Sequence, residues 1–195
     1  ALWWVSLFLW CGLIYSIFVG MITKENKGSI EKAMNGGWLL SIVATQSITV
    51  LGSTVASSMW EYQEELFFAL TAFWLFGTML YIWIITLIFY RYMFYQFSPS
   101  DLMPPYWINM GAAAISTLAG VSLLSPLNDV VFLQSIAPFL RGFSIMNWAT
   151  ATWWVPMLLF LGIWRHVIKK IPLSYHPLYW GLVFPLGMYS VCTYK

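Results

Sequence analysis

The chain has 195 residues, of which 61% are hydrophobic and only 8% are charged, whereas about 25% of the residues of an ordinary globular domain are charged. A soluble fold of this size has too small an interior to bury so much apolar surface, so a soluble globular protein is excluded. The charged residues stand between long uncharged stretches, each longer than the roughly 20 helical residues that cross a bilayer. This pattern predicts an all-α integral membrane protein.

Six transmembrane helices are predicted in a single domain, residues 1–195. The expected spans are, in chain order, about 1–23, 36–58, 66–91, 106–125, 143–165 and 173–194. The uncharged stretch between Asp129 and Arg141 is too short to cross the bilayer and contains Pro138, so we expect that segment to lie along the membrane surface. Because a span reaches each end of the chain, we expect the chain to be part of a longer protein.

The basic residues are distributed unevenly over the two sides that alternating spans define. One side holds seven of the nine Lys and Arg residues, namely Lys24, Lys27, Lys32, Arg91, Arg165, Lys169 and Lys170. The other side holds only Arg141 and Lys195. Short connections rich in Lys and Arg remain on the cytoplasmic side. We therefore expect 24–35, 91–105 and 165–172 to face the cytoplasm of a multi-pass protein in the cell (plasma) membrane.

Two kinds of span alternate along the chain. Span 66–91 is rich in bulky aromatic residues such as Trp74 and Trp83, which we expect to point away from the centre of the protein. Spans 36–58 and 106–125 instead carry small residues three or four positions apart, which share one helix face: Ser41, Thr45, Thr49, Gly52, Asn109, Ala113, Ser116 and Gly120. A ring of such helical hairpins would make these faces the lining of a central pore. Close packing between membrane helices is the alternative explanation.

The last span contains Pro185, which removes a backbone hydrogen bond and clashes with the carbonyl group of Gly181. We therefore expect a kink or local unwinding there. Phe184 lies about ten residues, or roughly 15 Å, into this span, near the middle of the bilayer. A bulky apolar ring beside a broken helix can close a pore, so Phe184 and Pro185 are candidate gate residues and Gly181 is a candidate pore-lining residue. The alternative is an ordinary phenylalanine on a proline-kinked packing helix.

The sequence contains no motif typical of an enzyme or a metal site. Cys11 and Cys192 lie in apolar stretches and are interpreted as packing residues. His166 and His176 lie near the ends of predicted helices and belong to no catalytic or metal-binding motif. We therefore expect no catalytic residues, no metal, no cofactor and no nucleic-acid partner.

Four separated stretches are distinctive: GGWLLSIVATQS at 36–47, PPYWINMG at 104–111, WATATWW at 148–154 and WGLVFPLGMY at 180–189. They resemble motifs of the tellurite-resistance/dicarboxylate transporter family, which includes bacterial tellurite-resistance proteins, fungal malate and sulfite transporters and plant slow-type anion channels. The resemblance extends, in order, over essentially the whole chain. It implies a membrane transporter or channel for small anions, either a C4-dicarboxylate such as malate or a tellurite- or sulfite-type oxyanion.

In this family ten helices form five hairpins around a central pore, and a phenylalanine of the ninth helix closes the path. Matching Phe184 to that gate makes the six present spans the fourth to the ninth, and six of ten helices do not close a pore by themselves. The resemblance further implies a homotrimer in the lipid bilayer. The alternative function is a non-conducting structural or assembly subunit of the membrane.

Overall fold

The computed structural model describes residues 2–195, apart from the side chains of Lys32 and Trp60. Two parts of the expectations lie outside the described residues. One is Ala1, which begins the first expected span. The other is the side chain of Lys32, one of the basic residues used to predict the orientation. All regular elements of the described chain are helices, which confirms the predicted all-α class. The α-helices are α1 (Leu2–Thr23), α2 (Ile30–Ala33), α3 (Leu40–Ala56), α4 (Gln63–Phe94), α5 (Ile108–Leu124), α6 (Val131–Ile163) and α7 (Trp180–Tyr194).

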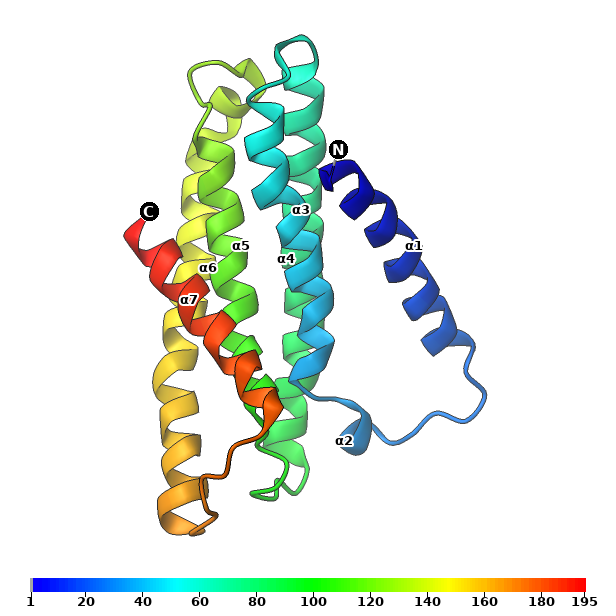
Figure 1. The fold of residues 1–195 in the computed structure, drawn as a ribbon, viewed down its shortest axis with the longest axis vertical. Coiled ribbons are helices and arrows are strands. Elements are labelled where there is room, and N and C mark those ends of the chain that lie inside the picture. Colours follow the sequence, from blue (N-terminus) through cyan, green and yellow to red (C-terminus); the bar gives the residue numbers. More distant parts are fainter. Residues whose placement is uncertain (1) are drawn as a thin grey trace.

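Helices α3 to α6 lie side by side along the long axis of the molecule, and α7 crosses them obliquely (Figure 1). The central helix is α5, which contacts α3, α4, α6 and α7. Every residue of α5 from Ile108 to Gly120 is buried, because its many small side chains let the neighbouring helices approach closely. Helix α1 contacts α3 through its first half and diverges from the bundle toward Thr23 (Figure 1).

Five helical segments are long and apolar enough to cross a membrane, judged by length and composition over the described residues: Leu2–Thr23, Gly36–Ala56, Gln63–Phe94, Pro104–Leu124 and Val131–Ile168. They correspond to the first five expected spans. The sixth, expected over 173–194, contains α7 as a helix of only 15 residues. Its first part is not α-helical, because Pro172 and Pro177 each disfavour helical backbone at the preceding residue.

Helix α6 differs most from expectation. Residues 131–141 do not form a separate surface segment but are the first turns of one continuous 33-residue helix that contains Pro138. The carboxylate of Glu64 on α4 accepts hydrogen bonds from the backbone N–H groups of Val131 (2.7 Å) and Phe132 (3.2 Å). These bonds satisfy N–H groups that a helix start leaves open, and the negative charge suits that end of the helix dipole. The expectation for this segment was therefore wrong.

Helices α3, α5 and α7 all begin at the same end of the bundle, each after a short 3-10 turn: η1 (Gly36–Leu39), η3 (Pro104–Trp107) and η5 (Pro177–Tyr179). The turn η3 contacts both of the others. Gly36 lies so close to the backbone of Pro105 that a Cβ atom has no room there. The connections 24–35, 95–103 and 169–176 also lie at this end, which we call the basic end.

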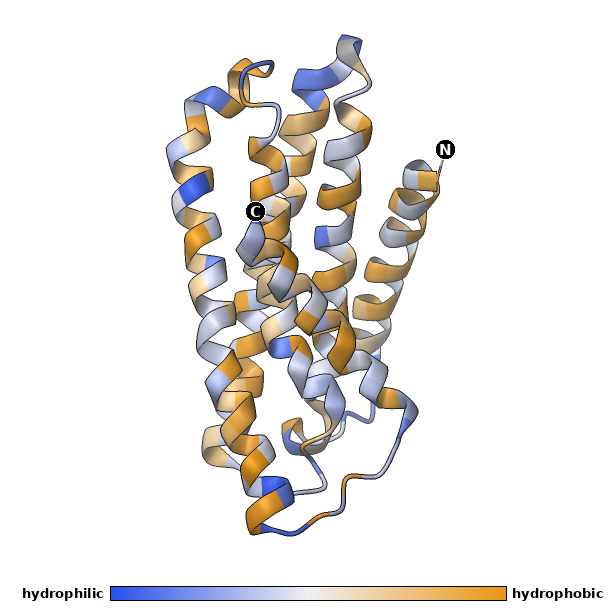
Figure 2. Ribbon diagram, turned by 60° about the vertical axis from the view of Figure 1, so that its left-hand side comes forward, coloured by the Kyte–Doolittle hydropathy of each residue, from blue (hydrophilic) through white to orange (hydrophobic). Residues whose placement is uncertain are grey.

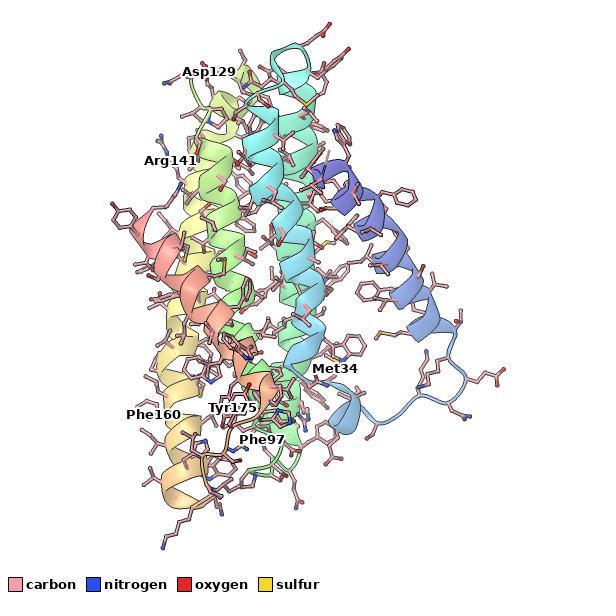
Figure 3. The ribbon with its side chains drawn as sticks, viewed as in Figure 1. Met34, Phe97, Asp129, Arg141, Phe160 and Tyr175 are labelled. Atoms are coloured by element: carbon pink, nitrogen blue, oxygen red, sulfur yellow. The ribbon has the colours of Figure 1, made fainter. Side chains whose placement is uncertain are left out.

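Polar residues gather toward the two ends of the molecule, and the helix shafts between them are mostly hydrophobic (Figure 2). Asp129 lies at the end opposite Phe97 and Tyr175 (Figure 3). Large apolar side chains such as Phe8 and Phe160 are exposed along the outside of the helices. Exposed apolar surface of this extent is typical of helices that face lipid.

Candidate functional site

Helix α7 rests on α5 at the candidate gate. Pro185 is buried against Gly111 of α5, where an added Cβ atom would lie 2.8 Å from the proline Cβ and Cγ and 3.0 Å from its Cα. Only a residue without a side chain permits this approach without movement of α7. Phe184, the other candidate gate residue, is 36% exposed. Helix α7 continues through Pro185, so of the two expected outcomes, a kink or local unwinding, the unwinding does not occur.

Gly181 lies one helical turn before Pro185 and is only partly buried. No atom outside its own helix lies within 4 Å of the position that a Cβ atom would take. The space beside Gly181 is therefore open, whereas the space beside Gly111 is filled. Gly181 and Phe184 lie on the part of α7 that is not buried against α5.

The small face of α3 mostly contacts the helices on either side of it. Thr45 accepts a hydrogen bond from the indole N–H of Trp10 on α1 (2.9 Å), and the hydroxyl of Thr49 donates to a backbone carbonyl of α4 (3.2 Å). Gly52 is buried against side chains of α1 and α4. Ser41 is partly exposed and borders the groove between α1 and α3. Of these four candidate pore-lining residues, Ser41 is the one that borders open space.

The small face of α5 is fully enclosed by its neighbours. Asn109, Ala113 and Ser116 have no exposed surface, and Gly120 is buried against α4 and α6. The side-chain amide of Asn109 donates to the hydroxyl of Tyr92 on α4 (3.1 Å). These contacts match the packing alternative, because the small residues hold α5 against the helices around it.

The two tryptophans expected to point outward behave differently. Trp83 is 57% exposed, as expected for a residue on the outside of α4. Trp74 is fully buried, and its indole N–H donates to the backbone carbonyl of Ser116 (2.8 Å). Its ring meets Phe143 of α6 edge to face, with 5.3 Å between the ring centroids. The expectation for Trp74 was therefore wrong, because its ring fills the space that small residues such as Gly120 leave between the helices.

Gln46 is a buried polar residue that the spacing argument did not select. Its side-chain amide on α3 donates to the backbone carbonyl of Trp74 (3.1 Å) and to the hydroxyl of Ser116 (3.1 Å). Its Oε1 atom is buried and has no hydrogen-bond partner among the described residues. A side-chain amide inside an otherwise apolar span was the sequence signal for this residue, since buried polar groups need partners.

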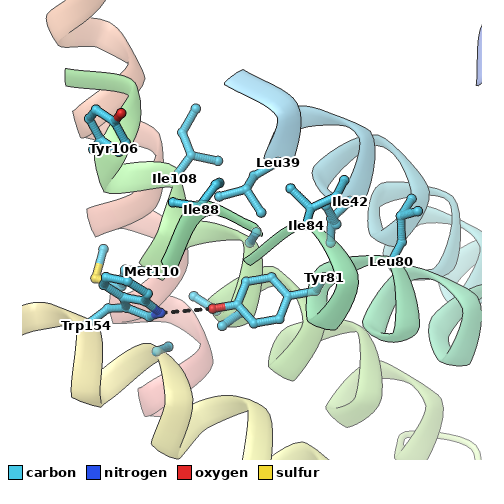
Figure 4. Close-up of a cluster of buried hydrophobic side chains, with 14 of the residues drawn as sticks. Leu39, Ile42, Leu80, Tyr81, Ile84, Ile88, Tyr106, Ile108, Met110 and Trp154 are labelled. Atoms are coloured by element: carbon cyan, nitrogen blue, oxygen red, sulfur yellow. Dashed lines mark hydrogen bonds between the residues drawn. The ribbon is translucent and has the colours of Figure 1, made fainter. Parts of the chain in front are cut away.

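A second polar link joins α4, α5 and α6. The hydroxyl of Tyr81 donates to the backbone carbonyl of Asn109 (3.0 Å) and accepts from the indole N–H of Trp154 (3.1 Å). Figure 4 shows this last bond within the surrounding cluster of buried hydrophobic side chains. The aromatic residues of α4 and α6 thus satisfy polar groups inside the bundle as well as covering its outside.

Arg91 is the one Lys or Arg residue among those with described side chains that is buried. Its guanidinium forms an ion pair with Asp101 (3.7 Å), donates to the hydroxyl of Tyr106 and lies 5.7 Å from the centre of the Phe97 ring. Arg91 was counted only as a topology signal in the sequence. In the structure it holds the connection 95–103 and the start of η3 against α4, at the basic end.

A cavity of about 700 Å³ is a groove between α1 and α3. Apolar side chains make up most of its lining, and among the residues with described side chains none that is charged contributes to it. Such a groove suits apolar groups rather than anions. The described residues also contain no group of three His, Cys, Asp or Glu residues placed to hold a metal ion.

Comparison with known proteins finds relatives among membrane proteins. A membrane protein of Mycobacterium tuberculosis, described as uncharacterised, is 39% identical over 116 residues, which make up 60% of this chain and 58% of that protein. Two uncharacterised transporters of Methanocaldococcus jannaschii are 28% and 26% identical over 182 residues, or 93% of this chain. The matches cover 52% and 51% of these transporters, so the chain spans about half of their length. No solved structure matches.

The profile of the family described as voltage-dependent anion channel matches residues 1–195. This match confirms the resemblance that the four motifs indicated, because that resemblance included the plant slow-type anion channels. The helical architecture, with five segments suited to cross a membrane, agrees with it. The chain is thus part of a multi-pass membrane protein and belongs to the voltage-dependent anion channel family.

Proposed function

We propose that the full-length protein carries small anions across the membrane, as a channel or transporter, along a path bordered by α3, α5 and α7. The observation that carries the proposal is the contact of Pro185 with Gly111, which fixes the helix bearing the partly exposed Phe184 on the central helix. Family membership supports the same class of activity, as do the two archaeal relatives that are named transporters.

The proposed substrates are a C4-dicarboxylate such as malate or a tellurite- or sulfite-type oxyanion. Helices α3, α5 and α7 contain no Lys, Arg, Asp or Glu residue. A path along them offers an anion hydroxyl and backbone groups but no full charge. Weak binding of this kind favours release as well as entry, which passage through a pore requires.

In this proposal Phe184 closes the path and Pro185 fixes its position. Gly181 lines the path, since the space beside it is open, whereas the open space beside Ser41 is the apolar groove between α1 and α3. The buried small residues Thr45, Thr49, Gly52, Asn109, Ala113, Ser116 and Gly120 contribute by letting the helices of the wall pack closely. The full-length protein is proposed to form a homotrimer in the cell membrane, with the basic end in the cytoplasm.

Reconstitution of the full-length protein in liposomes tests the proposal. The uptake of malate, sulfite, tellurite and chloride is measured separately, and protein-free liposomes provide the background. Uptake of at least one anion above background is expected. Background uptake of all four anions by correctly folded protein would contradict an anion pathway.

The alternative is a non-conducting structural or assembly subunit of the membrane. One observation favours it: seven of the nine candidate pore-lining residues are buried in contacts between helices. A structural subunit needs those contacts, and its partly exposed Phe184 would face lipid as Phe8 and Phe160 do. The liposome experiment separates the two functions, because only a pathway produces uptake.

A further inference from the structure

A small cavity lies at the basic end, between the end of α6 and the starts of α5 and α7. Its volume is about 50 Å³. Its lining combines two basic side chains with aromatic and apolar ones, among them Met103, Trp107, Arg165, His166, Tyr179 and Leu182. No Asp or Glu contributes to this lining. None of the candidate gate or pore-lining residues is among the described residues that line this cavity.

The last turn of α6 builds the basic wall of this cavity. After Ile163 the helix widens into a π-turn, η4 (Trp164–Ile168), which the backbone N–H of Lys169 closes on the carbonyl of Trp164 (2.9 Å). Lys170 then adopts a φ of 56°, a left-handed conformation that residues other than glycine rarely adopt. Wide turns of this kind are frequent at functional sites.

Each basic side chain of the wall has a nitrogen that makes no hydrogen bond to another described residue. The Nε atom of Arg165 is buried and has no hydrogen-bond partner among the described residues. The Nδ1 atom of His166 lies 2.8 Å from the backbone carbonyl of Ile171, so Nδ1 carries the proton and donates. Nε2 is the ring nitrogen left for a ligand, and in the protonated ring it donates as well.

The acidic group nearest in sequence to the lining is already paired. Asp101, which precedes the lining residue Leu102, forms its ion pair with Arg91 (3.7 Å). Lys169, by contrast, adds positive charge beside the π-turn, with its ammonium group 6.0 Å from the centre of the Trp164 ring. An anion in the cavity would therefore meet an excess of positive charge.

We propose that this cavity binds a phosphate group, with Arg165 and His166 as its ligands. The planar guanidinium matches the oxygen spacing of a phosphate and binds it through two hydrogen bonds. A volume of about 50 Å³ has room for a compact tetrahedral group, since about 10 to 15 Å³ of such space already holds one water molecule.

The phosphate group has two possible sources, a free phosphate ion or the headgroup of an anionic lipid. The exposed apolar side chains of Val167, Ile168 and Leu173 surround this end of α6, as expected where a helix end meets the bilayer surface. Both sources present the same chemistry to Arg165 and His166. The experiment therefore has one arm for each.

The test uses purified full-length protein in a neutral detergent. In the first arm, thermal unfolding is followed while inorganic phosphate is added, with sodium chloride of equal ionic strength as the reference. In the second arm, native mass spectrometry measures retention of phosphatidylglycerol relative to phosphatidylcholine. Each arm compares the wild type with Arg165→Gln and His166→Gln. Arg141→Gln is the matched control, because Arg141 is an exposed arginine on the same helix, far from the cavity.

Stabilisation of the wild type by phosphate, retention of phosphatidylglycerol, or both, is expected, and it identifies the source. Arg165→Gln should weaken the binding of whichever ligand is effective by about tenfold, the loss of affinity that follows when a hydrogen bond to a charged group is removed. Arg141→Gln should leave this affinity unchanged. Arg165→Lys keeps the positive charge but loses the planar guanidinium group, so this variant should also bind the phosphate group more weakly. An equal loss of affinity in Arg165→Gln and Arg141→Gln would show that the binding depends only on general positive charge and not on this site. The absence of any response of the wild type in both arms would overturn the proposal. Neither arm measures transport, so the result is independent of the proposed function.

Discussion

The contact between α5 and α7 gives a quantitative prediction for Gly111→Ala. The new Cβ atom would lie 2.8 Å from the Cβ and Cγ atoms of Pro185 and 3.0 Å from its Cα. Favourable contacts between carbon atoms require about 3.5 to 4.0 Å, so α7 has to move away by about 1 Å. The proline ring is rigid and cannot rotate aside. Adding a methyl group to such a filled contact costs about 1 to 3 kcal/mol.

The matched control is Gly187→Ala, on the same helix as Pro185. A Cβ atom at Gly187 has no atom within 4 Å outside its own helix. Alanine is a better helix former than glycine by about 0.5 to 1 kcal/mol, so this variant should be as stable as the wild type or more so. The two substitutions add the same methyl group, and their effects on stability should have opposite signs.

Unfolding of the full-length variants is measured in one detergent, and anion uptake is measured in liposomes at equal protein content. Gly111→Ala should unfold at a lower temperature than the wild type, and its uptake should change because the Phe184 ring moves with α7. Gly187→Ala should keep wild-type uptake. If Gly111→Ala is as stable and as active as Gly187→Ala, the contact of Pro185 with Gly111 does not position the gate.

Three further predictions concern the gate, a helix start and the orientation. Phe184→Ala should raise anion current at matched surface expression relative to Phe160→Ala on the outside of α6, because the ring that closes the proposed path is lost; equal currents would leave Phe184 as a packing residue. Glu64→Gln should destabilise the protein by about 1 kcal/mol relative to Glu65→Gln, because its charge and hydrogen bonds stabilise the start of α6; identical chemical denaturation curves would show that α6 starts without this cap. In a cysteine-free background, a cysteine at Glu61 should react with an impermeant thiol reagent in intact cells and one at Lys169 should not; the reverse pattern would invert the topology.

The spacing of charged residues was sufficient to predict five helical segments long and apolar enough to cross a membrane, because a membrane helix stays uncharged over its length in lipid. The same rule failed for the first turns of α6, which were split from the rest of the helix at Arg141. A long basic side chain can extend from a helix to the bilayer surface, so one arginine does not end a span. The cap that starts the helix comes from Glu64, 67 residues earlier in the chain, and a contact at that distance is not visible in local sequence.

The spacing of small residues identified α5, which is central in the bundle, but not where each face points. Thr49 and Ser116 recur at helical intervals, as pore-lining residues do, yet both are enclosed by other helices. Pore walls and close helix contacts favour the same small residues, so the pattern does not separate them. Trp74 illustrates the same ambiguity, since an aromatic residue suits lipid, but this one fills the interior beside Gly120. Such assignments depend on tertiary contacts.

The hairpin connectivity bears on how the proposed path could attract anions although α3, α5 and α7 carry no charged residue. Because α3, α5 and α7 are separated by the antiparallel α4 and α6, their N-termini all lie at the basic end, and each N-terminus carries a partial positive charge of about half an elementary charge. The negative ends of α4 and α6 lie there too, but Arg91 and Arg165 occupy their last turns and offset them. In the proposed function, an anion would meet these positive helix ends at the mouth of the path and only neutral groups of α3, α5 and α7 beyond it, so that entry would not require a deep binding site.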